Sequence, residues 1–193
     1  MRTGVFGGTF DPPHLGHLVA AADAFRALRL DRLLIVPSAA PPHKLRTVRA
    51  PAALRLEMVR AAVQGDPRFE ADGRELLREG PSYSVDTLRE LSGTGLAGEL
   101  FFLIGADNLR EIGGWREPHE IVRLAQLAVL TRAGEGAPPG GPFPALEVPV
   151  TRVDVSATDI RRRVAAGESI RYLVPEGVRA VVEREGLYRD GLI

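Results

Sequence analysis

Short apolar runs alternate with longer helical patterns along this chain, and this alternation limits the possible fold more than any other feature. Residues 3–6, 32–37 and 99–107 are almost continuously apolar, as expected for strands buried on both faces of a sheet. Between the first two runs, residues 15–30 carry apolar side chains at three- and four-residue spacing, which predicts a helix. We therefore predict an α/β fold, a Rossmann-like doubly wound parallel sheet with helices on both faces.

The remaining sequence continues this alternation. Ser84 is the expected N-cap of one helix, and Gly167 and Gly186 are expected to follow the ends of two others. Residues 133–144 are rich in glycine and proline, which predicts a mobile surface loop between two strands. The periodicity predicts helices over residues 51–63, 84–91, 117–125, 156–167 and 174–186, and strands over residues 125–132 and 146–150.

The length, charge balance and lack of cysteine exclude several classes of function for this chain. A chain of 193 residues that is 45% apolar can form one domain, which we expect to span residues 1–193 with a helical part from about 156 to 193. The 25 basic and 25 acidic residues balance, which argues against a nucleic-acid or membrane partner. Without cysteine there are no thiolate nucleophiles or cysteine metal sites. Because no leader or membrane-length apolar run is visible, we expect a cytoplasmic protein with a small-molecule partner, which could also form a homo-oligomer.

The stretch "GVFGGTFDPPHLGHLVAA" joins the first strand to the first helix. Gly7 and Gly8 allow the backbone to approach a ligand, and amide groups here and at the helix start can face phosphate oxygens. His14 and His17 lie about one helical turn apart, so both can point the same way, and Gly16 leaves space for a base or sugar. We favour a triphosphate cradle over helix capping alone or a metal pair, which lacks a nearby glutamate or cysteine.

Two further candidates follow apolar strands and so belong to the same edge of the sheet. Lys44 is the only lysine of the chain, and its flexible point charge suits a phosphate contact, although chance also explains one surviving lysine. Asp107, with Gly105 before it, could accept hydrogen bonds from a ribose or hold a metal's water shell; capping of a helix is the alternative.

The segment "SATDIR" begins a predicted helix much as the first loop does. Ser156 is a natural N-cap, Thr158 lies in the first turn, and Arg161 follows one turn later. Exposed amide groups and one guanidinium could together hold the β- and γ-phosphates of a nucleotide. Ordinary capping explains Ser156 alone but not the three residues together.

These motifs resemble those of the HxGH-type nucleotidyltransferases, and "GGTFDPPHLGHL" is similar to the pattern of the bacterial nicotinate mononucleotide adenylyltransferases within that superfamily. The resemblance continues in order through "PSAAPPHK", "PSYSVDTL", "LIGADNL", Trp115 and "VSATDIR". It implies that ATP and nicotinate mononucleotide are joined to give deamido-NAD and pyrophosphate, with Mg²⁺ carried by the ATP phosphates. The alternatives are another small-molecule adenylyl- or cytidylyltransferase, such as a phosphopantetheine adenylyltransferase, and a nucleotide-binding regulator without turnover.

The resemblance also implies roles for individual residues. Arg116 departs from the pattern, because relatives commonly place a second aromatic residue after the tryptophan; its side chain could turn into the acceptor pocket or outward. The implied catalytic residues are His14, His17 and Lys44. The implied ATP-binding residues are Gly7, Gly8, Thr9, Phe10, His14, His17, Gly105, Asp107, Ser156, Thr158 and Arg161. The implied acceptor-binding residues are Lys44, Tyr83, Thr87, Trp115 and Arg116.

Overall fold

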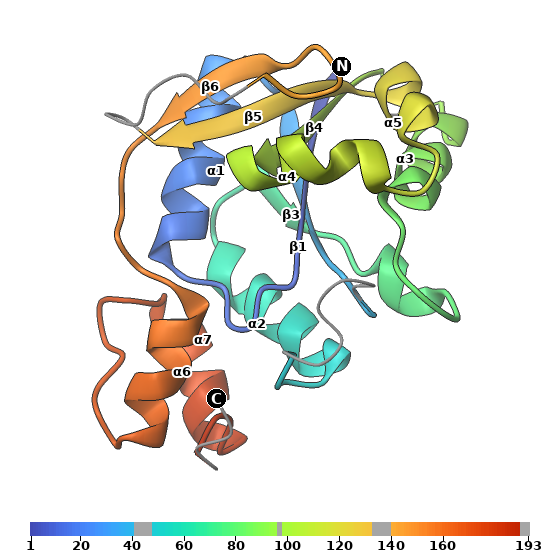
Figure 1. Ribbon diagram of the computed structural model, residues 1–193. Helices are drawn as coiled ribbons and strands as arrows, with labels where there is room; N and C mark the ends of the chain where they lie inside the picture. Colours follow the sequence, from blue (N-terminus) through green and yellow to red (C-terminus); the bar gives the residue numbers. More distant parts are fainter. Residues whose placement is uncertain (41–47, 96–97, 133–139, 190–193) are drawn as a thin grey trace.

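The computed structural model describes residues 1–40, 48–95, 98–132 and 140–189. Within these ranges six parallel strands form one sheet in the order β3-β2-β1-β4-β5-β6 (Figure 1). The order reverses between β1 and β4, and in open sheets of this kind ligands bind at that switch point. The predicted doubly wound parallel sheet is confirmed. The strands are β1 (Arg2–Gly8), β2 (Arg32–Pro37), β3 (Phe69–Ala71), β4 (Glu99–Gly105), β5 (Gln126–Arg132) and β6 (Leu146–Val150).

Helices cover both faces of the sheet. The described helices are α1 (Leu15–Ala27), α2 (Ala52–Val63), α3 (Ser84–Gly93), α4 (Ala106–Glu111), α5 (Pro118–Leu124), α6 (Ala157–Ala165) and α7 (Glu176–Arg184), with 3-10 turns η1 (Arg74–Leu77) and η2 (Ile112–Gly114). The helices α6 and α7 lie beyond the sheet, at the lower left of Figure 1, and α7 packs against α2. In the described part of the chain, no helix has the length and apolar character to span a bilayer.

The core divides along the two faces because successive strand residues point to opposite sides. Leu33 and Phe101 pack with Ala21 of α1 on one face. On the other face, Phe102 packs with Leu88 of α3 and with the buried residues of α5. A further cluster joins α2, α6 and α7, so the C-terminal helices are attached to the sheet through α2.

Most predicted elements are present, with two corrections. Ser84 is not an N-cap: Tyr83 occupies that position with extended backbone, and Ser84 is the first helical residue. The apolar run 99–107 is a strand only to Gly105, where α4 begins. Gly167 and Gly186 follow helix ends with φ values of 71° and 60°, as predicted.

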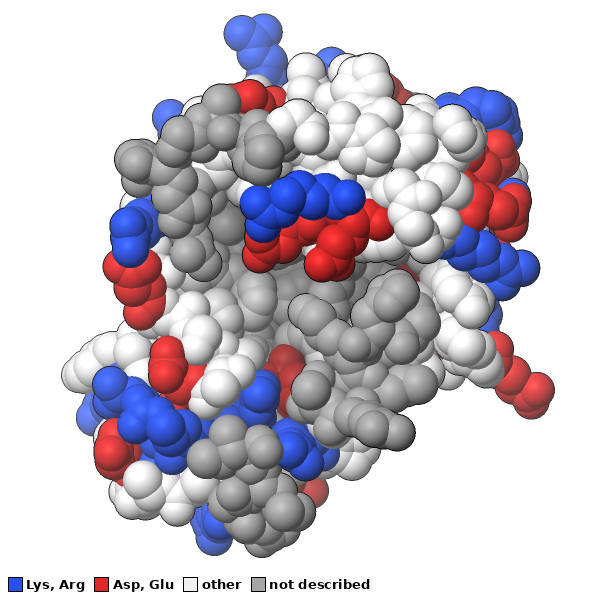
Figure 2. Space-filling model, in the orientation of Figure 1, with Lys and Arg blue, Asp and Glu red and all other residues white. Residues whose placement is uncertain are grey.

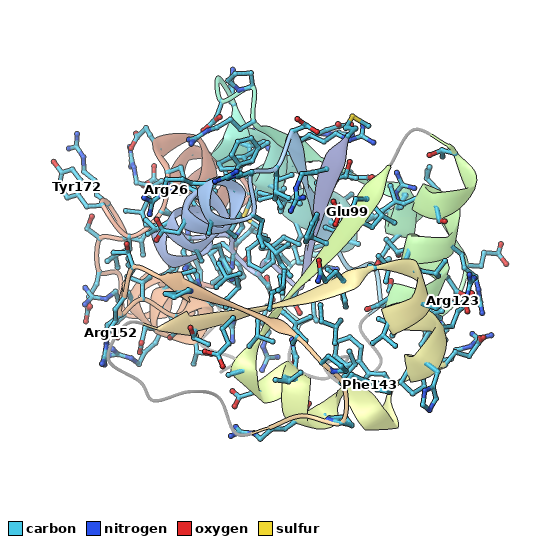
Figure 3. The ribbon with its side chains drawn as sticks, turned by 90° about the horizontal axis from the view of Figure 1, so that it is seen from above. Arg26, Glu99, Arg123, Phe143, Arg152 and Tyr172 are labelled. Atoms are coloured by element: carbon cyan, nitrogen blue, oxygen red, sulfur yellow. The ribbon has the colours of Figure 1, made fainter. Side chains whose placement is uncertain are left out.

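The predicted loop 133–144 is described only from residue 140. There Phe143 is half-buried and packs against the core cluster beneath α3 and α5. Its ring meets His119 of α5 edge to face, with ring centres 5.1 Å apart, and Figure 3 shows the side chain turned toward that helix. This end of the segment is therefore anchored to the core, while residues 133–139 lie outside the described part.

A buried arginine joins the loops that follow β1 and β2 to the segment before α2. Arg55 of α2 has 1% of its surface exposed. Its guanidinium donates hydrogen bonds to four backbone carbonyls that belong to three separate loops. The acceptors are the carbonyl oxygens of Thr9 at 2.8 Å, Ser38 at 2.6 Å, Ala39 at 3.0 Å and Ala50 at 3.1 Å. Burial lowers the pKa of Arg55, and the nearby Asp11 carboxylate opposes that shift.

We predict that Arg55→Met lowers the free energy of unfolding by about 3 kcal/mol or more, because four buried carbonyl groups lose their donor. Urea unfolding followed by circular dichroism measures this change. Arg60→Met, on the exposed side of the same helix, is the matched control and should change stability by less than about 0.5 kcal/mol. Equal effects of the two substitutions would contradict the central role of Arg55.

Candidate active site

A cavity of about 500 Å³ opens at the carboxyl ends of β1, β2 and β4. The predicted residues Gly7, Gly8, Thr9, Tyr83, Trp115 and Arg116 line it. The other lining residues, none of which was predicted as a site residue, are Val36, Ser38, Glu75, Ser82, Ser84, Phe102, Ile104, Asn108, Glu111, Gly114 and Ile121. One part of the wall is thus glycine backbone and another part is aromatic, at the edge of the sheet where the fold places ligands.

The two histidines of the first loop stack on each other. His14 is the N-cap of α1, and its ring centre lies 3.7 Å from that of His17, with 30° between the planes. The backbone amide of His14 donates to Nδ1 of His17 at 3.2 Å, and the Phe10 ring meets His17 edge to face. The two side chains therefore hold each other in one orientation at the start of the helix.

Burial keeps the His14 ring neutral. His14 is 7% exposed, and burial lowers its pKa from 6.5 to about 4, so the ring is neutral at pH 7. Its buried Nδ1 has no hydrogen-bond partner among the described residues. A buried ring nitrogen without a partner is an uncommon feature, and it suits a ligand that would supply the missing hydrogen bond.

The loop that carries the histidines is fixed by a buried carboxylate. Asp11 is 3% exposed and accepts hydrogen bonds from the backbone amides of Arg49 at 2.6 Å and Ala50 at 3.1 Å. The Tyr188 hydroxyl donates to the same carboxylate at 2.7 Å, and burial raises the pKa of Tyr188. The first loop is therefore held both by the segment before α2 and by the C-terminal end of the described chain.

The motif at α6 lies against this same loop. Ser156 caps α6 as predicted, accepting a hydrogen bond from the amide of Asp159 at 3.0 Å. Arg161 donates to the carbonyl of Asp11 at 2.8 Å and to the Thr158 hydroxyl at 3.1 Å. Its buried Nε has no hydrogen-bond partner in the described ranges. Figure 2 shows basic side chains gathered over this C-terminal part of the molecule.

Three residues that were predicted to bind the substrates are not among the described residues that line the cavity. Gly105 is the N-cap of α4, and a Cβ at that position would meet nothing within 4 Å, so the space expected beside it is present. Asp107 is exposed and pairs with Arg110 on the surface of α4, where Figure 2 shows acidic and basic side chains together. Neither residue lines the cavity. Lys44 lies outside the described residues.

Aromatic residues form the second part of the wall. Trp115 is half-buried and meets Phe102 of β4 edge to face, with ring centres 6.2 Å apart. The guanidinium of Arg116 lies over the Tyr83 ring, 4.7 Å from its centre. Arg116 is half exposed and also lies 3.8 Å from the carboxylate of Asp86, so its charge is partly balanced at the mouth of the cavity.

Thr87 lies behind this wall and not on it. It is 3% exposed, and its hydroxyl donates to the buried Glu75 carboxyl and accepts from Arg78, both at 2.6 Å. Burial raises the pKa of Glu75, while hydrogen bonds from Thr87 and Ser82 oppose the shift. Glu75 lines the cavity, so Thr87 touches the site through this carboxyl.

Sequence reasoning assigned no role to Asp11, Arg55, Glu75, Ser82 or Tyr188. One signal was available for Arg55, which lies four residues before Val59 on the apolar side of α2 and thus occupies a core position.

Within the described residues, no three histidine, cysteine, aspartate or glutamate side chains converge as a metal site.

Comparison with known proteins defines the class. The cytidylyltransferase-like family model matches residues 5–163, a range that contains every predicted site residue. A Plasmodium falciparum structure titled nicotinic acid mononucleotide adenylyltransferase complexed with NaAD has a TM-score of 0.73. It covers 97% of each chain at 14% identity, a likeness of fold alone. The chain is thus a cytidylyltransferase-like protein.

Sequence relatives narrow this further. The chain is 47% identical over 189 residues to a Thermus thermophilus protein, covering 98% of this chain and 100% of the relative. It is 42% identical over 187 residues to a Geobacillus thermodenitrificans protein, covering 97% of this chain and 86% of the relative. Both relatives are named "probable nicotinate-nucleotide adenylyltransferase". Within its class, the chain belongs to the nicotinate-nucleotide adenylyltransferase family.

The buried His14 predicts a pH dependence of stability. Its pKa is about 4 in the folded chain and near 6.5 when unfolded, so between these values the unfolded state binds a proton that the folded state does not. The His14 contribution is therefore complete above pH 6.5 and falls, by up to about 3 kcal/mol, as the pH drops to 4. Urea unfolding of wild type and His14→Asn in phosphate-free buffer should show a stability difference that moves in favour of the variant toward low pH. Parallel profiles would contradict the assignment.

Proposed function

We propose that this protein transfers the adenylyl group of ATP to nicotinate mononucleotide, giving deamido-NAD and pyrophosphate in NAD biosynthesis. The observation that carries the proposal is the cavity at the carboxyl ends of the strands, which is lined by glycine backbone and by aromatic rings. The histidine pair does not line it, but the loop of Gly7 and Gly8 leads directly into that pair at the start of α1. A phosphate chain suits the glycine wall and a pyridine ring suits the aromatic wall. The full-length relatives support the same reaction by their names.

The reaction needs little covalent chemistry from the protein. The acceptor phosphate is already ionised at pH 7, so its oxygen attacks the α-phosphorus of ATP in line without a general base. One oxygen–phosphorus bond forms while the bond to the bridging oxygen breaks, and pyrophosphate leaves with that electron pair. Catalysis then consists of holding the two substrates in line and stabilising the charge that moves to the leaving group.

The described residues divide these tasks. The backbone of Gly7 and Gly8 approaches the α-phosphate, and His17 donates to the phosphates as negative charge develops on pyrophosphate. His14 holds the His17 ring by stacking. Ser156, Thr158 and Arg161 bind the outer phosphates, and Asp11 keeps Arg161 beside the first loop through its carbonyl.

Mg²⁺ reaches this site with ATP as its phosphate complex, and no protein-only cluster is required for it. The exposed Asp107 carboxylate at the start of α4 is the group that would hold the water shell of the ion. On the acceptor side, Tyr83 and Trp115 hold the pyridine ring, with Arg116 at the mouth.

The first test is His17→Ala. We expect kcat to fall at least roughly a hundredfold, equivalent to about 2.7 kcal/mol, because a donor aimed at the leaving phosphates is lost from a largely dry site. Pyrophosphate release at saturating Mg-ATP and acceptor measures the rate. Thermal melting is the control and should change by only a few degrees, since the substitution at this half-buried position removes an acceptor for the His14 amide rather than core volume. Near-normal turnover would remove His17 from the mechanism.

The second test is the choice of acceptor. We expect kcat/KM for nicotinate mononucleotide to exceed that for nicotinamide mononucleotide by at least roughly a hundredfold, because backbone N–H groups near Trp115 donate to a carboxylate but leave the NH₂ of the nicotinamide facing other donors. Arg116 is already engaged by Tyr83 and Asp86, so Arg116→Ala should change this ratio by less than about threefold.

The same assay separates the alternatives. Turnover of phosphopantetheine with neither pyridine nucleotide accepted would indicate the related transferase reaction, and nucleotide binding without pyrophosphate release would indicate a regulator. A large fall of the acceptor ratio in Arg116→Ala would assign the preference to the guanidinium.

A further inference from the structure

One short segment joins the two walls of the cavity. Ser38, Ala39 and Ala40 follow β2 and lie between the glycine loop and the start of α3. On one side, the amide of Ser38 donates to the carbonyl of Gly8 at 2.9 Å. On the other side, the amide of Ser82 donates to the carbonyl of Ala40 at 3.0 Å.

The Ser82 side chain makes two further hydrogen bonds to this segment. Its hydroxyl oxygen accepts the amide of Ala39 at 3.0 Å and that of Ala40 at 3.2 Å. Both amides follow the strand directly, beyond the reach of the sheet ladder, so the hydroxyl supplies an acceptor that no neighbouring strand gives. One hydroxyl therefore fixes two consecutive peptide groups.

The orientation of that hydroxyl is set by Glu75. Because the oxygen accepts two amides, its proton is available as a donor, and the Glu75 carboxyl receives it. Glu75 is 7% exposed and is itself oriented by the buried Thr87 hydroxyl at 2.6 Å. The carboxyl is thus the partner of the Ser82 proton, while the Ser82 oxygen faces the segment.

Arg55 holds the same segment from the opposite side through the carbonyls of Ser38 and Ala39. The same guanidinium also binds the carbonyl of Thr9 in the glycine loop. The backbone amides and carbonyls of Ser38, Ala39 and Ala40 are thus all hydrogen-bonded. Loops are usually more mobile than this, so the position of this segment is unusually well fixed.

We propose that Ser82 is a positioning residue for the transfer reaction: its hydroxyl fixes Ser38–Ala40 and thereby sets the distance between the glycine loop and the ring wall. The inference rests on the proposed function, in which the first wall holds ATP and the second holds the acceptor. Ser38 and Ser82 both line the cavity, so displacement of this segment changes the separation of the two substrates. In-line attack is sensitive to such displacement, and a shift of about 1 Å can cost roughly a hundredfold in rate.

The test compares Ser82→Ala and Ser82→Cys with Ser82→Thr. Alanine removes the acceptor, and cysteine keeps the side-chain size while offering only a weak acceptor, whereas threonine retains the hydroxyl. We expect kcat to fall at least about tenfold in the first two variants, with the Kd of a nonhydrolysable ATP analogue changed less than about twofold. Ser82→Thr should restore kcat to within about threefold of wild type. Ser92→Ala, on the exposed end of α3, is the matched control and should leave kcat unchanged.

A second readout does not depend on turnover. Residue-resolved amide exchange should show the Ala39 and Ala40 amides exchanging at least about tenfold faster in Ser82→Ala and Ser82→Cys than in wild type and Ser82→Thr. Wild-type kcat in the alanine and cysteine variants, or unchanged exchange at these two amides, would overturn the proposal. Failure of the wild-type protein to adenylylate nicotinate mononucleotide would instead refute the proposed function, and the exchange result would still decide whether Ser82 fixes the segment.

Discussion

The site depends on one buried cation and the carbonyl groups around it. Arg55 binds the backbone after β1, the backbone after β2 and the residue that precedes α2. Two of these segments leave the neighbouring strands β1 and β2, and the third leads into α2. A planar guanidinium with five donors can satisfy several carbonyl groups at once, which a lysine with three donors on a flexible stem cannot do in the same geometry.

The buried carboxylate of Asp11 also fixes the glycine loop, as Arg55 does, by binding backbone groups of a neighbouring segment. Asp11 accepts two backbone amides and the Tyr188 hydroxyl, while its own carbonyl receives Arg161. Through these contacts the C-terminal helices α6 and α7 are attached to the loop that begins the chain. Arg161, proposed to bind phosphates from α6, is consequently positioned by the backbone carbonyl of the same residue whose carboxylate fixes the loop of the histidine pair.

These networks also explain how a chain without net charge can serve anionic substrates. Its formal charge at pH 7 is +0, and His14 is neutral because burial opposes its protonation. Attraction then has to come from local donors, namely backbone amides, the His17 ring and the Arg161 guanidinium. Such groups are already oriented before a ligand binds, so little reorganisation accompanies the movement of charge in the reaction.

The sequence by itself determined the order of strands and helices along the chain, apart from the short β3 and α4, which it missed, because apolar periodicity reports which face of each element is buried. It also located the glycine loop, the histidine pair and the cap Ser156, whose geometry is local to one strand end or one helix start. The boundary at Ser84 was wrong by one residue, since the extended residue before α3 is Tyr83, which has no side-chain capping bond that a sequence pattern could reveal. Only the tertiary structure decided that Thr87 lies behind Glu75, that Arg116 stacks on Tyr83, and that Arg161 meets Asp11, 150 residues away. Contacts of this kind depend on which loops the parallel sheet brings to one edge. Local sequence patterns describe only neighbouring residues, so they cannot predict contacts between residues far apart in the chain.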